Sequence, residues 1–137
     1  YNLNKYYYQY KKKFRNKDIL KTTENNGYIK MQVFKNNILD CYLIFWEPHS
    51  KSPIHNHADN GCYLKVLNGC LEERLYNPIP NNGELQLNKT NIINENNIGF
   101  IHNDIGIHSI TNPNDYLVTS IHVYSPPDFN ARIFNEK

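Results

Sequence analysis

Charge of one sign, cysteine and long apolar segments are all scarce in this sequence, and each shortage excludes a class of protein. Lysine and arginine number 15 and aspartate and glutamate 13, so the formal net charge of +2 is too small to favour nucleic-acid binding. No apolar run is long enough to cross a bilayer, and no secretory signal pattern opens the chain. We therefore expect neither a nucleic-acid partner nor a membrane partner.

Cysteine is limited to three residues, Cys41, Cys62 and Cys70. They form neither a C-x-x-C pair nor an even set that could close disulfide bonds. Free thiols suit a reducing compartment, so we expect a cytoplasmic protein. Separately, we expect a monomer. Cys41 and Cys70 match no functional pattern and are candidates for the core.

The length of 137 residues corresponds to one domain with room for a hydrophobic core. Eleven tyrosines, six phenylalanines and one tryptophan supply much of the bulk for that core. No internal repeat, linker or second domain is evident. We predict a single domain over residues 1–137, with a helical segment over about 1–24 and a barrel over about 28–127.

The pattern of apolar residues changes from helical spacing before Asn25 to alternation after Gly27. Many short strands separated by turns, without a βαβ rhythm, indicate an all-β sandwich or barrel. Asn68-Gly69 is a hairpin signal between two of these strands. Strands are predicted at 28–33, 38–46, 62–67, 70–76, 84–87, 90–93, 98–102, 108–111 and 116–124.

Two histidines one residue apart, His55 and His57, form the central candidate site. On a β-strand, residues at i and i+2 point to the same face, so the two imidazoles would lie side by side. Histidine is the commonest metal ligand among side chains, so the pair indicates a metal site that needs a third ligand. The alternative is a polar loop that happens to contain two histidines.

The histidine pair belongs to a two-part pattern. It reads H-x-H-x4-C-x6-G from His55, and G-x-H-x3-N from Gly106. This pattern resembles the cupin superfamily, which implies an all-β double-stranded β-helix, or jelly-roll barrel, here with a short N-terminal helical segment. The first cupin motif usually carries a glutamate ligand after its histidines. In this sequence Cys62 replaces that glutamate.

Longer runs around these motifs are similar to the cysteine dioxygenases within that superfamily. Trp46, nine positions before His55, also fits the family. The resemblance covers roughly Tyr28 to Phe134, with the motifs in the family's order. The runs that carry it are SPIHNHA at 52–58, CYLKVLNG at 62–69, NDIGIH at 103–108 and SIHVYSPP at 120–127.

The resemblance implies an Fe(II) ion held by three neutral histidines, His55, His57 and His108. Without a carboxylate ligand the site keeps the metal's full positive charge, which helps a substrate thiol to bind as thiolate. Two histidines with a carboxylate are the more common arrangement in non-haem iron oxygenases. The alternative is that these histidines are structural or solvent-exposed.

The resemblance also implies a thioether bond between the Cys62 sulfur and the Tyr124 ring, beside the iron. Ser120, His122 and Tyr124 stand at alternate positions of one predicted strand and so share a face. The family uses this row as a relay that orients the tyrosine hydroxyl, so we expect Tyr124, Cys62, His122 and Ser120 to be catalytic. Alternatively, Cys62 is a small buried hydrophobe and Tyr124 an ordinary core aromatic.

Substrate binding is where the sequence departs from the family. A Tyr-x-Arg motif supplies an arginine for the substrate carboxylate in cysteine dioxygenases, whereas this chain has Tyr28-Ile29-Lys30. A lysine meets a carboxylate as a point charge, without the bidentate fork. Lys30, Tyr28 and Ile44 are the predicted substrate-binding residues. The alternative for Lys30 is a solvated lysine on an exposed strand face.

Together these features predict a thiol dioxygenase that converts L-cysteine and O2 to cysteine sulfinic acid. One alternative is a dioxygenase for another small thiol such as 3-mercaptopropionate, because the residue that binds the carboxylate is altered. A second is a cupin that binds a metal or ligand without turnover. A third is a cupin with another metal and a non-thiol substrate, against which the pair of Cys62 and Tyr124 argues.

Overall fold

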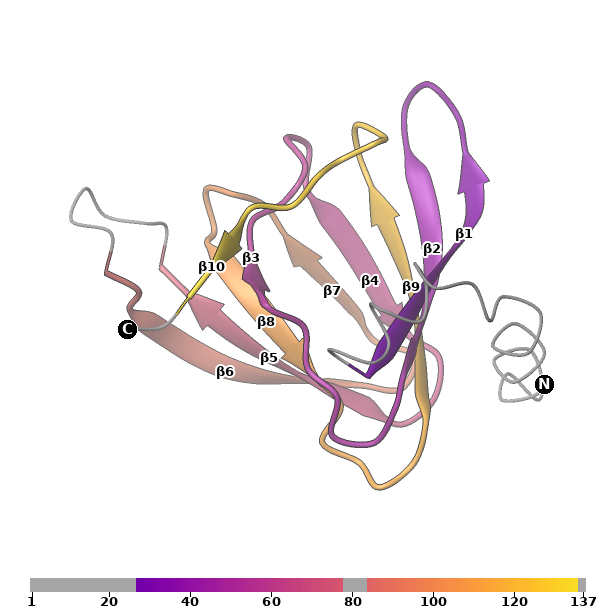
Figure 1. Cartoon of the computed structure of the whole chain (residues 1–137), viewed down its shortest axis with the longest axis vertical. Coiled ribbons are helices and arrows are strands. Elements are labelled where there is room, and N and C mark those ends of the chain that lie inside the picture. Colours follow the sequence, from indigo (N-terminus) through magenta and orange to yellow (C-terminus); the bar gives the residue numbers. More distant parts are fainter. Residues whose placement is uncertain (1–26, 78–83, 136–137) are drawn as a thin grey trace.

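The structure is a computed structural model that describes residues 27–77 and 84–135. The helix predicted over 1–24 lies outside the described residues. Every regular element within them is a β-strand, which confirms the predicted all-β class (Figure 1). The described residues contain no helix with the length and apolarity needed to span a bilayer. The strands are β1 (Tyr28–Lys35), β2 (Asp40–Trp46), β3 (Ile54–His55), β4 (Cys62–Val66), β5 (Cys70–Tyr76), β6 (Leu87–Asn94), β7 (Ile98–Ile101), β8 (Ile107–Thr111), β9 (Val118–Tyr124) and β10 (Ile133–Phe134).

Two five-stranded antiparallel sheets enclose the interior, with strand orders β1-β2-β9-β4-β7 and β10-β3-β8-β5-β6. From β2 onward, the chain passes to the other sheet at every connection except the one between β5 and β6. This alternation winds the chain around the barrel. It brings strands that are distant in sequence, such as β3 and β8, next to each other.

The alternation between sheets overturns the predicted hairpin at Asn68-Gly69. β4 pairs with β7 and β9, whereas β5 pairs with β6 and β8, so the two strands flanking this turn lie in different sheets. Gly69 has a φ of 73°, which suits a sharp reversal. A local turn signal therefore specified the change of direction but not the partner strand.

Three other boundaries differ from the sequence prediction. Ile38 was predicted in a strand but is 69% exposed in a turn, because the Asn36 side chain accepts hydrogen bonds from the Ile38 and Leu39 backbone N–H groups. A single strand, β6, replaces the two short strands predicted at 84–87 and 90–93, and it pairs along the whole of β5. Residues 84–86 precede this strand and are not part of it. Strand β10 adds a pairing with β3 beyond the predicted end of the barrel.

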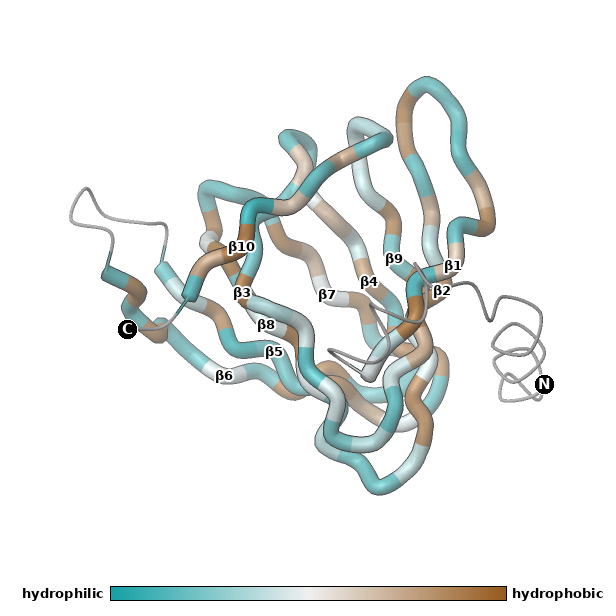
Figure 2. The backbone as a smooth tube through the Cα atoms, in the orientation of Figure 1, coloured by the Kyte–Doolittle hydropathy of each residue, from teal (hydrophilic) through white to brown (hydrophobic). Residues whose placement is uncertain are grey.

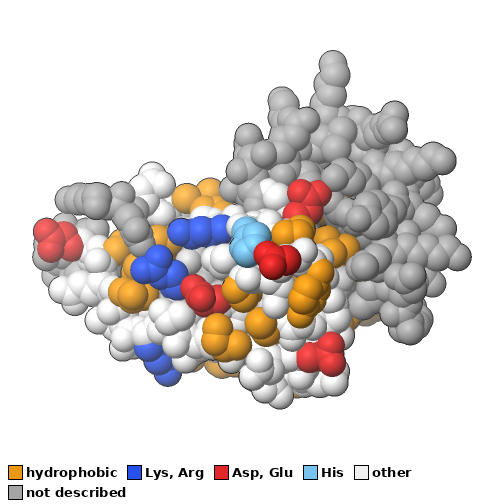
Figure 3. Space-filling model, turned by 90° about the horizontal axis from the view of Figure 1, so that it is seen from below, with side chains coloured by type: hydrophobic (Ala, Val, Ile, Leu, Met, Phe, Trp, Pro, Cys, Tyr) orange, Lys and Arg blue, Asp and Glu red, His pale blue; other side chains and the backbone are white. Residues whose placement is uncertain are grey.

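The core lies between the two sheets because alternate residues of each strand face inward. In Figure 2, hydrophobic and hydrophilic residues alternate along the strands. On the face shown in Figure 3, acidic, basic and hydrophobic side chains are interspersed, as on an ordinary solvated surface. The largest buried cluster draws on both sheets and consists of Ile44, Trp46, Leu64, Val66, Leu71, Ile93, Ile110 and Val118.

Candidate metal centre and pocket

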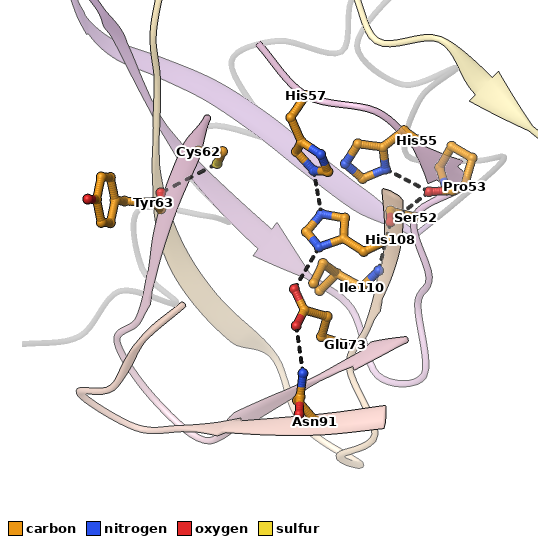
Figure 4. Close-up of polar contacts among 10 residues, drawn as sticks. All are labelled: Ser52, Pro53, His55, His57, Cys62, Tyr63, Glu73, Asn91, His108 and Ile110. Carbon is orange, nitrogen blue, oxygen red and sulfur yellow. Dashed lines mark hydrogen bonds and ion pairs between the residues drawn. The ribbon is translucent and has the colours of Figure 1, made fainter. Parts of the chain in front are cut away.

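Three histidines converge inside the barrel (Figure 4). His55 on β3 and His108 on β8 are directly paired across the sheet. His57 lies beyond the end of β3, so the prediction that one strand presents both histidines of the pair is wrong. Its ring nevertheless reaches the same point, since potential ligand atoms of all three side chains lie within 4.8 Å of one another.

Asn103 explains how His57 is held without a strand. The Asn103 Oδ1 accepts a hydrogen bond of 2.8 Å from the His57 backbone N–H, and the Asn103 Nδ2 donates one of 2.9 Å to the His57 carbonyl. The amide thus replaces both bonds that a neighbouring strand would have made. Asn103 was not predicted as a site residue. The only signal for it was its place in the NDIGIH run.

Hydrogen-bond partners determine which nitrogen of His55 and of His108 faces the shared point. His55 Nδ1 lies 2.8 Å from the Pro53 carbonyl, and His108 Nδ1 lies 2.8 Å from Glu73 Oε2. A carbonyl or carboxylate oxygen only accepts, so both Nδ1 atoms carry the proton and both Nε2 atoms present lone pairs. These tautomers leave Nε2 as the available ligand atom.

The third ring completes an arrangement that fits a cation. His57 Nε2 lies only 2.9 Å from His108 Nε2. Among the described residues, nothing hydrogen-bonds to the buried Nδ1 of His57. Burial lowers the pKa of His55, His57 and His108, and neighbouring histidines lower it further for the last two. All three are neutral at pH 7, the form that binds a metal.

Glu73 is a site residue that was not predicted. It is 9% exposed, and its Oε1 accepts a 3.0 Å hydrogen bond from the Asn91 amide while its Oε2 meets His108. Burial raises the pKa of this carboxyl, and the Asn91 hydrogen bond opposes that shift. A sequence signal existed: in Leu71-Glu-Glu-Arg-Leu75, strand alternation places Glu73 on the face of the two leucines.

Cys62 and Tyr124 are directly opposite each other on the paired strands β4 and β9. Both are buried, and both belong to one apolar cluster. Burial raises the pKa of Cys62 to about 12 and raises the pKa of Tyr124 well above its usual value, so both groups are protonated at neutral pH. The strand register therefore brings together the two groups for which the resemblance implies a thioether.

The row of Ser120, His122 and Tyr124 on β9 faces the interior as predicted from alternation. Trp46 Nε1 donates a 2.9 Å hydrogen bond to Ser120 Oγ, and that oxygen lies 2.7 Å from His122 Nε2. Because Oγ already accepts from Trp46 and burial keeps His122 neutral, the Ser120 hydroxyl can donate to Nε2. The His122 ring stacks near Tyr124, with centroids 6.2 Å apart.

A pocket of about 170 Å³ joins these groups. All of the predicted site residues line it except Ser120, which lies behind His122. Pockets for drug-sized ligands measure roughly 300–1,000 Å³, so this one suits a small molecule. The predicted residues that line the pocket are Tyr28, Lys30, Ile44, His55, His57, Cys62, His108, His122 and Tyr124.

Lys30 is accessible to solvent but lies on the pocket side of β1. Its Nζ lies 4.8 Å from the centroid of the Tyr42 ring and 4.9 Å from that of Tyr124. Ring faces attract an ammonium group and hold it close to the site. Asp40 lines the same pocket, and its buried Oδ1 has no hydrogen-bond partner among the described residues. The pocket thus contains side chains of both charges.

Comparison with known proteins gives relatives of two kinds. The sequence model of the family described as cysteine dioxygenase type I matches residues 3–137. The bovine cysteine dioxygenase type 1 is 31% identical over 104 residues, which cover 74% of this chain and 52% of the bovine protein. The human protein of the same name is 29% identical over the same shares. The chain thus spans about half the length of the curated relatives it matches.

Solved structures of much lower identity share the fold. A Klebsiella pneumoniae protein with a double-stranded β-helix domain matches with a TM-score of 0.63 and 14% identity, covering 80% of this chain and 85% of that one. The cupin domain of Schizosaccharomyces pombe Cnp3 matches with a TM-score of 0.58 and 13% identity, covering 72% and 64%. These likenesses confirm the predicted cupin double-stranded β-helix.

Proposed function

Because the chain belongs to the cysteine dioxygenase type I family, we propose that it oxidises L-cysteine with O2 to cysteine sulfinic acid. The observation that carries this proposal is the convergence of three neutral histidines in a small pocket that also contains Cys62 and Tyr124. The reaction balances without another substrate. Both atoms of O2 become sulfinate oxygens, and the thiol sulfur supplies four electrons.

The metal that we propose is Fe(II), held by Nε2 of His55, His57 and His108. Two of these atoms have their lone pairs directed by hydrogen bonds at the opposite ring nitrogen, which supports the assignment. When bound there, ferrous iron would supply positive charge that favours a thiolate and electrons that activate O2. Cys62 stands where many cupins have a carboxylate, so the protein adds no negative charge to the ligand set.

Lys30 is the residue that we propose for the substrate carboxylate. The Nζ lies over Tyr42 and Tyr124, in the pocket that contains the histidines. A single ammonium group can pair with a carboxylate but does not fix its orientation as an arginine fork does. Tyr28 and Ile44 bound the same pocket and would restrict the size of the substrate.

Tyr124 is the proposed acid–base and positioning group beside the substrate. Its high pKa keeps the hydroxyl protonated, so it can donate a hydrogen bond to an oxygen of the reacting species. His122 packs near its ring, and Ser120 and Trp46 hold His122 in turn. A thioether with Cys62 would further restrain the ring. Its formation removes two hydrogens, for which O2 is the proposed oxidant.

Two alternatives keep specific support. The first is a dioxygenase for 3-mercaptopropionate, supported by Lys30 in place of the family's arginine, because this thiol has the carboxylate of cysteine and lacks only its amine. The second alternative is a cupin that binds a metal without turnover, for which the three converging histidines alone would suffice. For location, the free state of Cys41, Cys62 and Cys70 supports a reducing compartment such as the cytoplasm.

Oxygen uptake by the iron-loaded protein tests the proposal. The protein is loaded with Fe(II) without oxygen, then given oxygen with cysteine, 3-mercaptopropionate or cysteamine in turn, and the products are identified by mass. Sulfinate from cysteine alone supports the proposal, whereas faster oxidation of 3-mercaptopropionate supports the first alternative. Bound iron with no uptake for any thiol contradicts the enzyme. The variant His108→Ala removes one of the three histidines. Its matched control is His49→Ala, which changes an exposed histidine paired with Asp115.

A further inference from the structure

Glu73 is a charged residue in a row of β5 that is otherwise apolar. Leu71, Glu73 and Leu75 alternate along the strand and face the interior, with exposed fractions of 0%, 9% and 5%. Burying a carboxylate costs several kcal/mol unless hydrogen bonds and a charge partner compensate for its lost hydration. The partners of Glu73 therefore indicate what the buried carboxylate does.

Those partners lie on the two strands that flank β5. Asn91 on β6 donates to Oε1 over 3.0 Å, and His108 on β8 lies 2.8 Å from Oε2 through Nδ1 (Figure 4). Asn91 is directly opposite Glu73 in the register of the sheet. The carboxylate thus has each oxygen engaged, and a chain of side chains runs from Asn91 through Glu73 to His108.

The acceptor differs from the one used by the neighbouring histidine. His55 Nδ1 faces the neutral carbonyl of Pro53, whereas His108 Nδ1 faces a carboxylate. Both acceptors direct Nε2 toward the shared point. A carboxylate in addition raises the electron density that the imidazole can give to a metal, and such partners tune affinity strongly. We therefore expect His108 to be a stronger metal ligand than His55.

We propose that Glu73, supported by Asn91, is a positioning residue that orients His108 and supplies the negative charge that the three-histidine set lacks. In the common iron arrangement of two histidines and one carboxylate, that charge is a direct ligand. Here the charge belongs to Glu73, which contacts His108 and is not itself one of the three proposed ligands. The inference rests on the metal site of the proposed function, but not on thiol oxidation.

Metal affinity of the full chain tests this inference without any thiol present. Glu73→Gln keeps the shape of the side chain and removes its charge. Glu72→Gln, the adjacent position on the opposite face of β5, is the matched control. Fe(II) affinity is measured anaerobically by competition with a coloured chelator. We expect Glu73→Gln to bind Fe(II) about 10–100-fold more weakly, as for other partners of metal-bound histidines. We expect no such change for Glu72→Gln.

A second readout separates positioning from mere stability. Co(II) is bound to each variant and its visible absorption recorded, because the bands respond to the geometry and donor strength of the ligands. A changed Co(II) spectrum is expected for Glu73→Gln, and the wild-type spectrum for Glu72→Gln. If Glu73→Gln does not fold, Asn91→Ala, which removes the support of Oε1, carries the test with the same expected direction.

A folded Glu73→Gln protein with wild-type Fe(II) affinity and a wild-type Co(II) spectrum overturns the inference. If Glu73→Gln does not fold, the same result for Asn91→Ala overturns the inference. Folding of each variant is checked by circular dichroism and urea unfolding of the metal-free protein. Should affinity fall as expected while the wild type oxidises no thiol, the proposed function fails and the role of Glu73 stands.

Discussion

The three histidines differ in what holds each ring from behind. His55 has a backbone carbonyl, His108 has the carboxylate of Glu73, and His57 is held through its backbone by Asn103. The hydrogen bonds at Nδ1 thus fix the ring orientation and the tautomer of His55 and His108. For His57, the hydrogen bonds of Asn103 fix the position of the backbone. The residues that decide the chemistry of the site include partners that the motif spacing alone does not reveal.

Lys30 gives the first prediction, which concerns substrate binding. We expect Lys30→Met to raise KM for cysteine by about tenfold or more, since a hydrogen bond to a charged group contributes about 1.5–3 kcal/mol. Cysteamine has no carboxylate, so its inhibition constant as a competitor of cysteine should not change. Lys65→Met, on the outward face of β4, is the control. An equal rise for both thiols would show that Lys30 acts through something other than the carboxylate.

Cys62 gives the second prediction, which concerns the thioether. We expect protein that has turned over with iron and oxygen to contain a fraction lighter by two hydrogens in its intact mass. The two residues are directly opposite each other on β4 and β9, which places their side chains next to each other. Cys62→Ser should abolish this fraction, and Cys70→Ser should retain it. A mass deficit that persists in Cys62→Ser would refute the crosslink.

At the scale of elements, the site depends on segments between strands as much as on the strands. Strand β3 has only two residues, and it ends before His57. The segment before β8 contains Gly106, whose φ is 153° and whose place leaves no room for a side chain. An added Cβ would stand 2.1 Å from the Tyr76 carbonyl oxygen. This close approach sets the path of the chain into His108.

Gly106 accordingly gives the third prediction. We expect Gly106→Ala to lower the free energy of unfolding by about 2–3 kcal/mol, because the backbone conformation is strained for alanine and the contact is with backbone. Urea unfolding measures the loss. Gly99→Ala is the control, since the one tight contact of its Cβ would be with the end of the Ile93 side chain, at 3.0 Å, which can move. Equal losses for the two variants would contradict this explanation.

Strand patterns in the sequence predicted most elements, because alternation directly records which face is buried. Which strands pair with each other was harder to predict from the sequence. The Asn68-Gly69 turn has the chemistry of a hairpin, yet it connects two sheets, since pairing depends on residues far away in the chain. Glu73 was missed for a related reason. Its meaning appears only when β5 lies between Asn91 and His108.

At the scale of the whole molecule, the barrel joins residues distant in sequence around one small pocket. The three histidines come from β3, the segment after it and β8, so a bound metal would connect parts of the chain that separate on unfolding. A ligand that binds only the folded state stabilises it by mass action. The pocket of about 170 Å³ in turn limits the substrate to a small molecule.

Metal-linked stability gives the fourth prediction. We expect Fe(II) at 100 times its dissociation constant to raise the free energy of unfolding by about 2.7 kcal/mol. A chelator should reverse the effect. His108→Ala should lose this increment, whereas His49→Ala should keep it, because His49 is exposed and outside the cluster. Anaerobic thermal unfolding measures the shift. The same stabilisation in His108→Ala would show that the metal binds elsewhere.

We propose that this chain adds both atoms of O2 to the sulfur of cysteine. The most direct measurement supplies the anaerobic, iron-loaded protein with cysteine and isotopically labelled O2, and then determines the label in the product by mass spectrometry. We expect one O2 to be consumed for each cysteine, and a sulfinate in which both oxygens carry the label. A product with one labelled oxygen, or cystine as the only product despite bound iron, would contradict it.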